Sequence, residues 1–441
     1  MLNQLSVRRK DAENHQTMKN RVSLIVVLLL QAILVNAQFD EWFYNKTLRM
    51  DYQHSGTAKT EVFSFQEWIE EPFWGGSQVN LIDTFGYGQY QLQVLDKSTN
   101  KLLYSRGFST LFSEWQTTAE AGKINRSFPE AVVMPYPKKD AVVIILSRNK
   151  KGVFEESFKQ EFSPSDYFVR KELKRKATAF DIEVHGDASN KVDIVIIPEG
   201  YTSEQMDLFK RDCSRFAEEF FKFSPYKEYR ESFNLRGVLV PSEESGTDIP
   251  KEGIWRNTAV NSRFYTFDLD RYVMTHDFQS VRDAAANAPY DQIYILVNTE
   301  RYGGGAIYNF YSMSVNSNPY AGKIFIHELG HGFAGLADEY YTSAVAYNDF
   351  YQMDVEPWEP NITTLVDFDA KWKHLLPQGQ AIPTIPTKEN QDQMGVFEGG
   401  GYSAKGVYRP RQDCLMHTFK GSTFCGACDE AIVKMIMFYS K

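Results

Sequence analysis

Residues 326–340 read IHELGHGFAGLADEY and contain the pattern His-Glu-x-x-His. On a helix, His327 and His331 lie one turn apart on the same face, where both imidazoles can bind one metal ion. Glu328 directly follows the first histidine, so its carboxylate is expected beside the open coordination position of the ion. The pattern predicts a zinc hydrolase, in the first place a protease, in which Glu328 is the general base that takes a proton from metal-activated water.

The surrounding residues predict a helix over 321–333, with apolar side chains before and after the two histidines. Gly330 and Gly332 are poor helix formers, so their presence inside this helix indicates close packing or a bound group. Gly335 is a natural stop for the helix.

A catalytic zinc site needs a third protein ligand. Asp338 follows three residues after Gly335, where the chain can turn back, and it is the predicted third ligand. Glu339 and His417 are the alternatives, and a solvated loop is the other interpretation of Asp338 and Glu339. The segment from His327 to Asp338 resembles the metzincin pattern His-Glu-x-x-His-x-x-Gly-x-x-His/Asp. In this chain three residues, rather than two, separate His331 from Gly335.

Residues 413–417 resemble the methionine turn of the metzincins, in which Met416 would form an apolar floor below the metal. Some metzincins have a tyrosine two residues after this methionine, where this chain has Thr418. Tyr402 and Tyr408, in the glycine-rich segment 399–410, are candidates to donate to a developing oxyanion or to contact substrate. Packing is the more usual role of a tyrosine.

These motifs, with residues 192–202 (VDIVIIPEGYT) and the pair Cys425 and Cys428, together resemble the bacterial immunoglobulin A peptidase family of metallopeptidases. The resemblance extends to a family-type N-terminal domain that begins near Lys46. It implies secretion, a Zn²⁺ cofactor and endopeptidase activity on an extended protein or peptide substrate. It does not imply that this chain cuts immunoglobulin A.

The start of the chain predicts export. Arg21 precedes an apolar run over 22–35, and Val35-Asn36-Ala37 then provides a signal-peptidase site, so residues 1–37 are expected to be a signal peptide cleaved after Ala37. Translation from Met18 would give such a peptide an ordinary basic beginning. The run is too short for a membrane span. The mature protein is expected to be secreted or periplasmic, without a transmembrane anchor.

The composition fits a secreted globular enzyme. A net charge of -9 argues against nucleic acid as a partner, and an aromatic content of 15% with mixed charges excludes disorder. About 400 residues remain after signal cleavage, which is enough for two domains.

Two domains are predicted. Short alternating or apolar runs, such as 90–95 and 141–146, predict an all-β sandwich-like domain over 38–168. Residues 169–441 are predicted to form an α/β metzincin-like catalytic domain with a mixed sheet and the zinc helix. Within it, 304–314 is expected to be the edge strand that pairs with substrate, or else an ordinary hairpin. The basic run 170–176 is interpreted as a solvated junction.

The chain has four cysteines. Cys213 is expected to be a buried thiol on an apolar helix face. Cys414, Cys425 and Cys428 surround the predicted methionine turn, and in an oxidising compartment a disulfide between two of them is the first expectation. The alternative is a second zinc site with His417 as its fourth ligand.

The sequence therefore predicts a secreted zinc endopeptidase that acts on extracellular proteins, such as immunoglobulins or mucosal glycoproteins. Two other functions stay open. One is a metal-dependent amide hydrolase acting on glycoconjugates, and the other is a secreted binding module with a vestigial zinc site.

Overall fold

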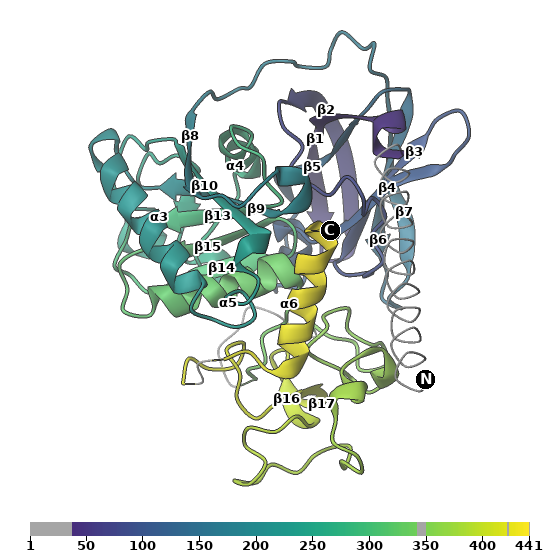
Figure 1. Cartoon of the computed structure of the whole chain (residues 1–441), viewed down its shortest axis with the longest axis vertical. Helices are drawn as coiled ribbons and strands as arrows, with labels where there is room; N and C mark the ends of the chain where they lie inside the picture. Colours follow the sequence, from purple (N-terminus) through teal and green to yellow (C-terminus); the bar gives the residue numbers. More distant parts are fainter. Residues whose placement is uncertain (1–37, 342–349, 421–422, 441) are drawn as a thin grey trace, which may run out of the picture.

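The computed structural model describes residues 38–341, 350–420 and 423–440 (Figure 1). The predicted signal peptide, residues 1–37, lies outside the described residues. Within the described ranges, no helix is both long enough and apolar enough to cross a membrane.

The first part of the chain forms two antiparallel sheets. The three-stranded sheet has the order β2-β1-β5, and the four-stranded sheet has the order β4-β3-β6-β7. Their strands are β1 (Phe43–Thr57), β2 (Thr60–Glu71), β3 (Tyr90–Asp96), β4 (Leu102–Phe108), β5 (Arg126–Pro137), β6 (Ala141–Arg148) and β7 (Phe154–Phe162). Met50 and Val132 from the first sheet share one apolar core with Val94 and Val143 from the second. Two sheets around one core agree with the β-rich first part that the sequence predicts.

The second part contains a six-stranded mixed sheet with the order β14-β15-β13-β9-β10-β8. Its strands are β8 (Thr178–Glu183), β9 (Val192–Glu199), β10 (Phe233–Leu239), β13 (Gln292–Val297), β14 (Gly304–Ile307) and β15 (Tyr311–Val315). The four central strands are parallel, whereas β14 and β8 pair antiparallel at the two edges. The predicted mixed sheet is therefore present. Residues 304–314, expected as one edge strand or as a hairpin, form the hairpin of β14 and β15, with β14 at the edge.

Helices cover both faces of this sheet (Figure 1). They are α3 (Met206–Phe220), α4 (Phe278–Ala285), α5 (Ala321–Ala334) and α6 (Gly426–Tyr439). Successive residues of a strand point to opposite faces. Accordingly, Ile194 and Ile196 of β9 join the core with α3, α5 and α6, while Val195 and Ile197 join the core with α4.

Short elements complete the described fold. They are α2 (Leu111–Trp115), β11 (Ser262–Arg263), β12 (Met274–Thr275), β16 (Phe397–Gly400), β17 (Ser403–Arg409) and the 3-10 turns η1 (Ala188–Asn190), η2 (Ser203–Gln205), η3 (Arg230–Ser232), η4 (Pro250–Glu252), η5 (Thr266–Asp268), η6 (Phe368–Ala370) and η7 (Lys373–Leu375).

Buried polar contacts join the two parts. The Arg49 guanidinium lies 2.7 Å from Oδ1 of Asp283 on α4, and Arg106 of β4 donates a 2.6 Å hydrogen bond to the hydroxyl of Tyr439 on α6. The basic run over 170–176 takes part as well, because Lys174 pairs with Glu67 at 2.6 Å. Most of the run is exposed, which agrees with the solvated junction that the sequence predicts, and Lys174 ties it to β2 of the first part.

Candidate metal centre

Helix α5 brings the two histidines of the His-Glu-x-x-His pattern together. The Nε2 atoms of His327 and His331 lie 3.1 Å apart. Oδ1 of Asp338 lies 3.1 Å from Nε2 of His327 and 3.4 Å from Nε2 of His331. Three potential ligand atoms thus converge on one point, from residues that the sequence predicts as metal ligands.

The second nitrogen of each imidazole is hydrogen-bonded to the main chain. Nδ1 of His327 donates to the carbonyl of Leu415 at 3.0 Å, and Nδ1 of His331 donates to the carbonyl of Leu336 at 2.6 Å. A proton on Nδ1 leaves the lone pair of Nε2 free, so these carbonyls fix the tautomer and the ring orientation that a metal ligand needs.

The chain reverses directly after α5 to bring Asp338 to the histidines. Gly335 caps the helix in the left-handed region, with φ 64°, and the amide of Leu336 donates to the carbonyl of Gly330. A residue with a side chain would be strained in this conformation. Asp338 is buried, and its Oδ2 accepts a 2.6 Å hydrogen bond from the hydroxyl of Tyr402.

The donor set fits a divalent metal ion. Oδ1 of Asp338 is buried without a hydrogen-bond partner and faces the two imidazoles. A buried carboxylate oxygen without a partner is costly unless a cation or a donor satisfies it. Two imidazoles and one carboxylate, with a further position open, are the protein ligands of many catalytic zinc sites.

The charged side chains of the ligand group shift one another's pKa values. Burial alone would raise the pKa of Asp338, but the imidazoles of His331 and His327 outweigh it and hold that pKa well below its usual range. Burial lowers the pKa of His331, yet without a metal ion the adjacent Asp338 carboxylate prevails and raises it to about 9. A metal ion bound at Nε2 would displace that proton.

The carboxylate of Glu328 lies at the edge strand of the mixed sheet. A Cβ atom at Gly304 of β14 would lie 2.6 Å from Oε1 of Glu328, so only glycine leaves room for this carboxylate. Burial raises the pKa of Glu328, although the neighbouring imidazoles of His327 and His331 oppose the shift. Glu328 is thus a buried carboxylate held beside the three potential ligands.

Met416 lies below α5. A Cβ at Gly330 would lie 3.0 Å from its Sδ, and a Cβ at Gly332 would lie 2.1 Å from Oγ of Ser312 on β15. The two glycines therefore allow close packing on both sides of the helix, as their position in the sequence indicates. Met416 is fully buried in a tight turn where the amides of His417 and Thr418 both donate to the carbonyl of Cys414.

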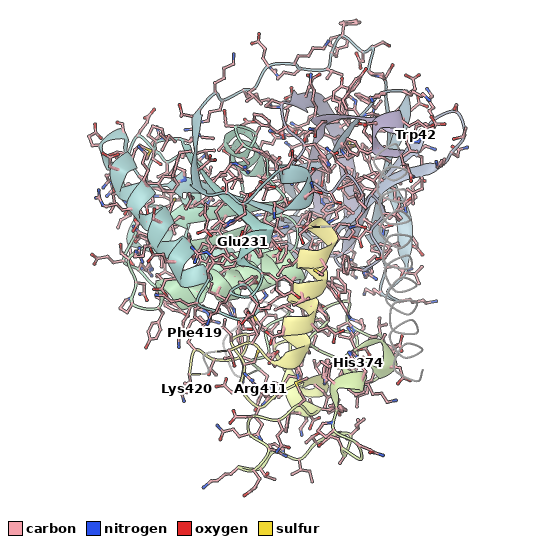
Figure 2. All side chains as sticks on the ribbon, viewed as in Figure 1. Trp42, Glu231, His374, Arg411, Phe419 and Lys420 are labelled. Carbon is pink, nitrogen blue, oxygen red and sulfur yellow. The ribbon has the colours of Figure 1, made fainter. Side chains whose placement is uncertain are left out.

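The ligand group opens into a cleft of about 380 Å³. Gly304, Gly305 and Ala306 of β14 form one wall of this cleft, and the turn after Cys414 contributes Leu415, His417 and Thr418. The ring of Phe419, labelled in Figure 2, lies edge-on to His327 with 5.7 Å between ring centroids. Glu328 and the two histidines line the same cleft.

The other predicted site residues divide between the cleft and its surroundings. Tyr402 lines the cleft, where it contacts Asp338. Tyr408 lies on β17, its main chain pairs with Thr363, and it is not among the residues that line the cleft. His417 lines the cleft without joining the ligand group, and the side chain of Glu339 points to the three clustered cysteines.

The sequence did not predict several residues that line the cleft, among them Arg271, Tyr302 and Tyr340. The guanidinium of Arg271 stacks on the ring of Tyr340 at 5.5 Å and donates to its hydroxyl at 3.3 Å. Arg271 lies far from α5 in the sequence and in no recognisable motif, whereas Tyr340 closes the decisive stretch and offered a signal.

The structure has no disulfide among Cys414, Cys425 and Cys428. They are buried free thiols, and the sulfurs of Cys425 and Cys428 are 3.5 Å apart, against about 2.05 Å in a disulfide. The expected disulfide stays a prediction. Glu339, and not the alternative fourth ligand His417, lies with the three sulfurs. Cys213 is a buried thiol on α3, as predicted.

Comparison with known families agrees with this geometry. The family model described as IgA Peptidase M64 matches residues 180–393 and 385–436, and the model described as Peptidase M64 N-terminus matches residues 38–159. Together they span most of the chain, so the protein belongs to the IgA peptidase M64 family. It is a peptidase, and its substrate is a protein. A search of curated proteins found no match.

Proposed function

We propose that this protein is a secreted, zinc-dependent endopeptidase whose metal ligands are His327, His331 and Asp338. The observation that carries the proposal is the convergence of two Nε2 atoms and the unpartnered Oδ1 of Asp338, within 3.4 Å of one another, beside the carboxylate of Glu328. Three protein ligands with an open fourth position are typical of catalytic rather than structural zinc.

In this proposal the protein residues have separate tasks. Glu328 accepts a proton from the attacking water and later donates it to the leaving amide nitrogen. The carbonyls of Leu415 and Leu336 orient the two histidine ligands. When bound, zinc would supply Lewis acidity towards the water and the scissile carbonyl. Arg271 and the cleft tyrosines are placed to donate to the developing oxyanion.

The edge strand β14 gives the substrate a place to bind. The main-chain groups of Gly304 point to the outer side of the strand. There its amide donates to the main-chain carbonyl of Arg271, and its carbonyl accepts from the main-chain amide of Val273. Alternate residues of a strand direct these groups to the same side. Ala306 therefore presents its amide and carbonyl to the cleft, where an extended peptide would pair with them as an added strand.

A metzincin-like catalytic domain is part of the proposal. It is supported by the mixed sheet with an antiparallel edge strand, the zinc-binding helix, the left-handed turn at Gly335 and Met416 below the ligand group. We further propose division into a sandwich-like domain over 38–168 and a catalytic domain over 169–441. Sheet composition and the separate family matches to 38–159 and 180–436 support that division.

Export and substrate class complete the proposal. The sequence of residues 1–37 supports a signal peptide cleaved after Ala37 and hence a secreted or periplasmic enzyme. Extracellular proteins, such as immunoglobulins or mucosal glycoproteins, are the substrates to test, and the name of the family supports immunoglobulin A among them.

Glu328→Gln tests the function directly. This variant is expected to keep its zinc while turnover of a protein substrate falls by about 10²- to 10⁴-fold, since only the proton acceptor is lost. His331→Ala is expected to lose both the zinc of this site and the activity. Glu172→Gln, at an exposed carboxylate away from the cleft, serves as the matched control. Full turnover by Glu328→Gln would overturn the assignment.

A further inference from the structure

A second group of potential ligands lies close to the first. It consists of Cys414, Cys425, Cys428 and Glu339, all fully buried. The group assembles from three places in the fold: the loop after α5, the turn that contains Met416, and the start of α6. Figure 2 labels Arg411 near the start of α6, where it donates to the carbonyl of Thr423 at 3.1 Å.

Four of the six distances among the ligand atoms match a tetrahedral metal site, and all four atoms lie within 4.8 Å of one another. With zinc–sulfur bonds of about 2.3 Å and a zinc–oxygen bond of about 2.0 Å, tetrahedral geometry separates two sulfurs by about 3.8 Å and a sulfur from an oxygen by about 3.5 Å. Sγ of Cys428 lies 3.5 Å from Sγ of Cys425 and 3.9 Å from Sγ of Cys414. Oε1 of Glu339 lies 3.3 Å from Sγ of Cys428 and 3.8 Å from Sγ of Cys425.

The carboxylate of Glu339 is an independent sign of a missing cation. Its side chain is 0% exposed, and its Oε2 is buried without a hydrogen-bond partner. Oε1 of Glu339 accepts a 3.1 Å hydrogen bond from the side-chain amide of Asn361, and this bond orients the carboxylate towards the sulfurs. A carboxylate buried among three thiols is unfavourable without a positive charge to pair with.

The main chain directs two partly positive groups at the sulfurs. The amide of Cys425 donates to Sγ of Cys414 at 3.3 Å. Cys425 is the N-cap residue of the 14-residue helix α6, and Cys428 lies in its first turn. The positive end of the helix dipole therefore points at the sulfur group, where it stabilises negative charge.

We propose that Cys414, Cys425, Cys428 and Glu339 bind a second zinc ion in a closed, structural site. Four protein ligands leave no position for water, in contrast to the three ligands of the candidate catalytic site. Binding would release the thiol protons to solvent, leaving three thiolates and one carboxylate around the ion. The proposal does not depend on catalysis at the first site.

This second site would position the first. Glu339 directly follows Asp338, and its amide donates to the carbonyl of Met416 at 2.8 Å. Cys414 begins the turn whose Leu415 carbonyl orients His327. One ion bound to these segments and to α6 would fix the Asp338 loop and the Met416 turn relative to α5.

The test counts metal ions and identifies their ligands. The wild-type protein, purified under reducing conditions, is expected to hold two zinc ions per chain by elemental analysis. His331→Ala should retain one of them, with X-ray absorption showing a sulfur-rich shell at about 2.3 Å. Cys428→Ser should lose this second ion, whereas Cys213→Ser, at a buried thiol of α3, should lose neither.

If a variant does not fold, the zinc content and X-ray absorption of the wild-type protein still decide the proposal. Two ions with sulfur in the averaged shell support the proposal. One ion with only nitrogen and oxygen ligands overturns it, as does an intact mass that shows a disulfide among the three cysteines. The two proposals fail separately. Glu328→Gln should lose activity and keep both ions, so its activity tests the catalytic proposal and its zinc content tests the second site.

Discussion

The hydroxyl of Tyr402 donates a 2.6 Å hydrogen bond to Oδ2 of Asp338, and this bond turns Oδ1 towards His327 and His331. Tyr402 itself lies in the left-handed region with φ 65°. A strained tyrosine thus holds the carboxylate that completes the ligand group, which makes it a positioning residue for the metal.

Tyr402→Phe is expected to weaken zinc binding at the candidate catalytic site by about 10- to 100-fold, because outer contacts of this kind tune ligand orientation. Competition with a chelator measures the affinity. Tyr408→Phe, which removes a hydroxyl outside the cleft lining, is the control and should bind zinc as the wild type does. Equal affinities for both variants would contradict the role of Tyr402.

Gly330→Ala is expected to destabilise the protein, although alanine is the better helix former by about 1 kcal/mol. The new methyl group would lie 3.0 Å from Sδ of Met416 and 3.3 Å from Leu336, and overpacking of this kind costs about 1–3 kcal/mol.

Gly322→Ala, in the first turn of the same helix, is the matched control for Gly330→Ala. Its nearest neighbour would be Cγ of Glu219 at an ordinary 3.4 Å, so this variant should be neutral or more stable. Chemical unfolding measures both. A stability for Gly330→Ala equal to that of Gly322→Ala would show that Met416 does not pack as described.

Arg271→Met is expected to lower kcat/KM by about 10²- to 10³-fold, because a lost oxyanion donor has an effect of this size. Arg271→Lys keeps the charge and should recover part of the loss. Arg256→Met, at a half-exposed arginine paired with Glu244, is the control. Unchanged kinetics for Arg271→Met would place the oxyanion donor elsewhere in the cleft.

His54 is expected to make stability depend on pH. It is fully buried, with Nδ1 at 2.9 Å from Glu130 and Nε2 at 3.2 Å from Glu61, which also accepts from Tyr90. Burial lowers the pKa of His54, but the Glu130 and Glu61 carboxylates outweigh it, so the folded pKa is raised above 6.5. The stabilisation is therefore complete below the unfolded pKa and is lost as pH rises through the folded pKa.

The comparison of His54→Gln with the wild type measures this dependence. The loss of unfolding free energy should be about 1–3 kcal/mol at about pH 6 and should shrink as the solution becomes more alkaline. A pH-independent difference for His54→Gln would contradict a charged imidazole in the folded state.

Single N-methyl groups along a peptide substrate test the proposed pairing with β14. Only alternate residues of an antiparallel strand bond to the neighbouring strand, so alternate positions near the scissile bond should lose about 3- to 10-fold in kcat/KM. The intervening positions provide the control within each peptide. A loss that does not alternate would indicate a binding mode other than strand addition.

The sequence predicted the elements with strong patterns. The helix around His327, the apolar face of α3 and the buried strands β9 and β13 are all present, because each has a clear period or a continuous apolar run. The long strands β1 and β2 were not individually recognised, since their partners are set by contacts distant in sequence.

The residues around the ligand group were harder to predict. Arg271 reaches the cleft only because the segment before β12 lies along β14, a relationship that no local pattern encodes. The position of Glu339 beside the cysteines was not predicted for a similar reason. Glu339 turns away from the histidines because the amide of Glu339 bonds to Met416 and its side chain meets Asn361, and both contacts depend on the tertiary fold.

The proposed pairing of substrate with the outer edge of β14 at Ala306 limits which parts of a target protein can be cut. A polypeptide aligned along it must give up its own helix or sheet contacts over several residues, and compact domains resist this opening. Hinges and exposed interdomain linkers already have the required freedom. Sensitivity to this enzyme should therefore follow the local unfolding of the target more closely than its residue composition.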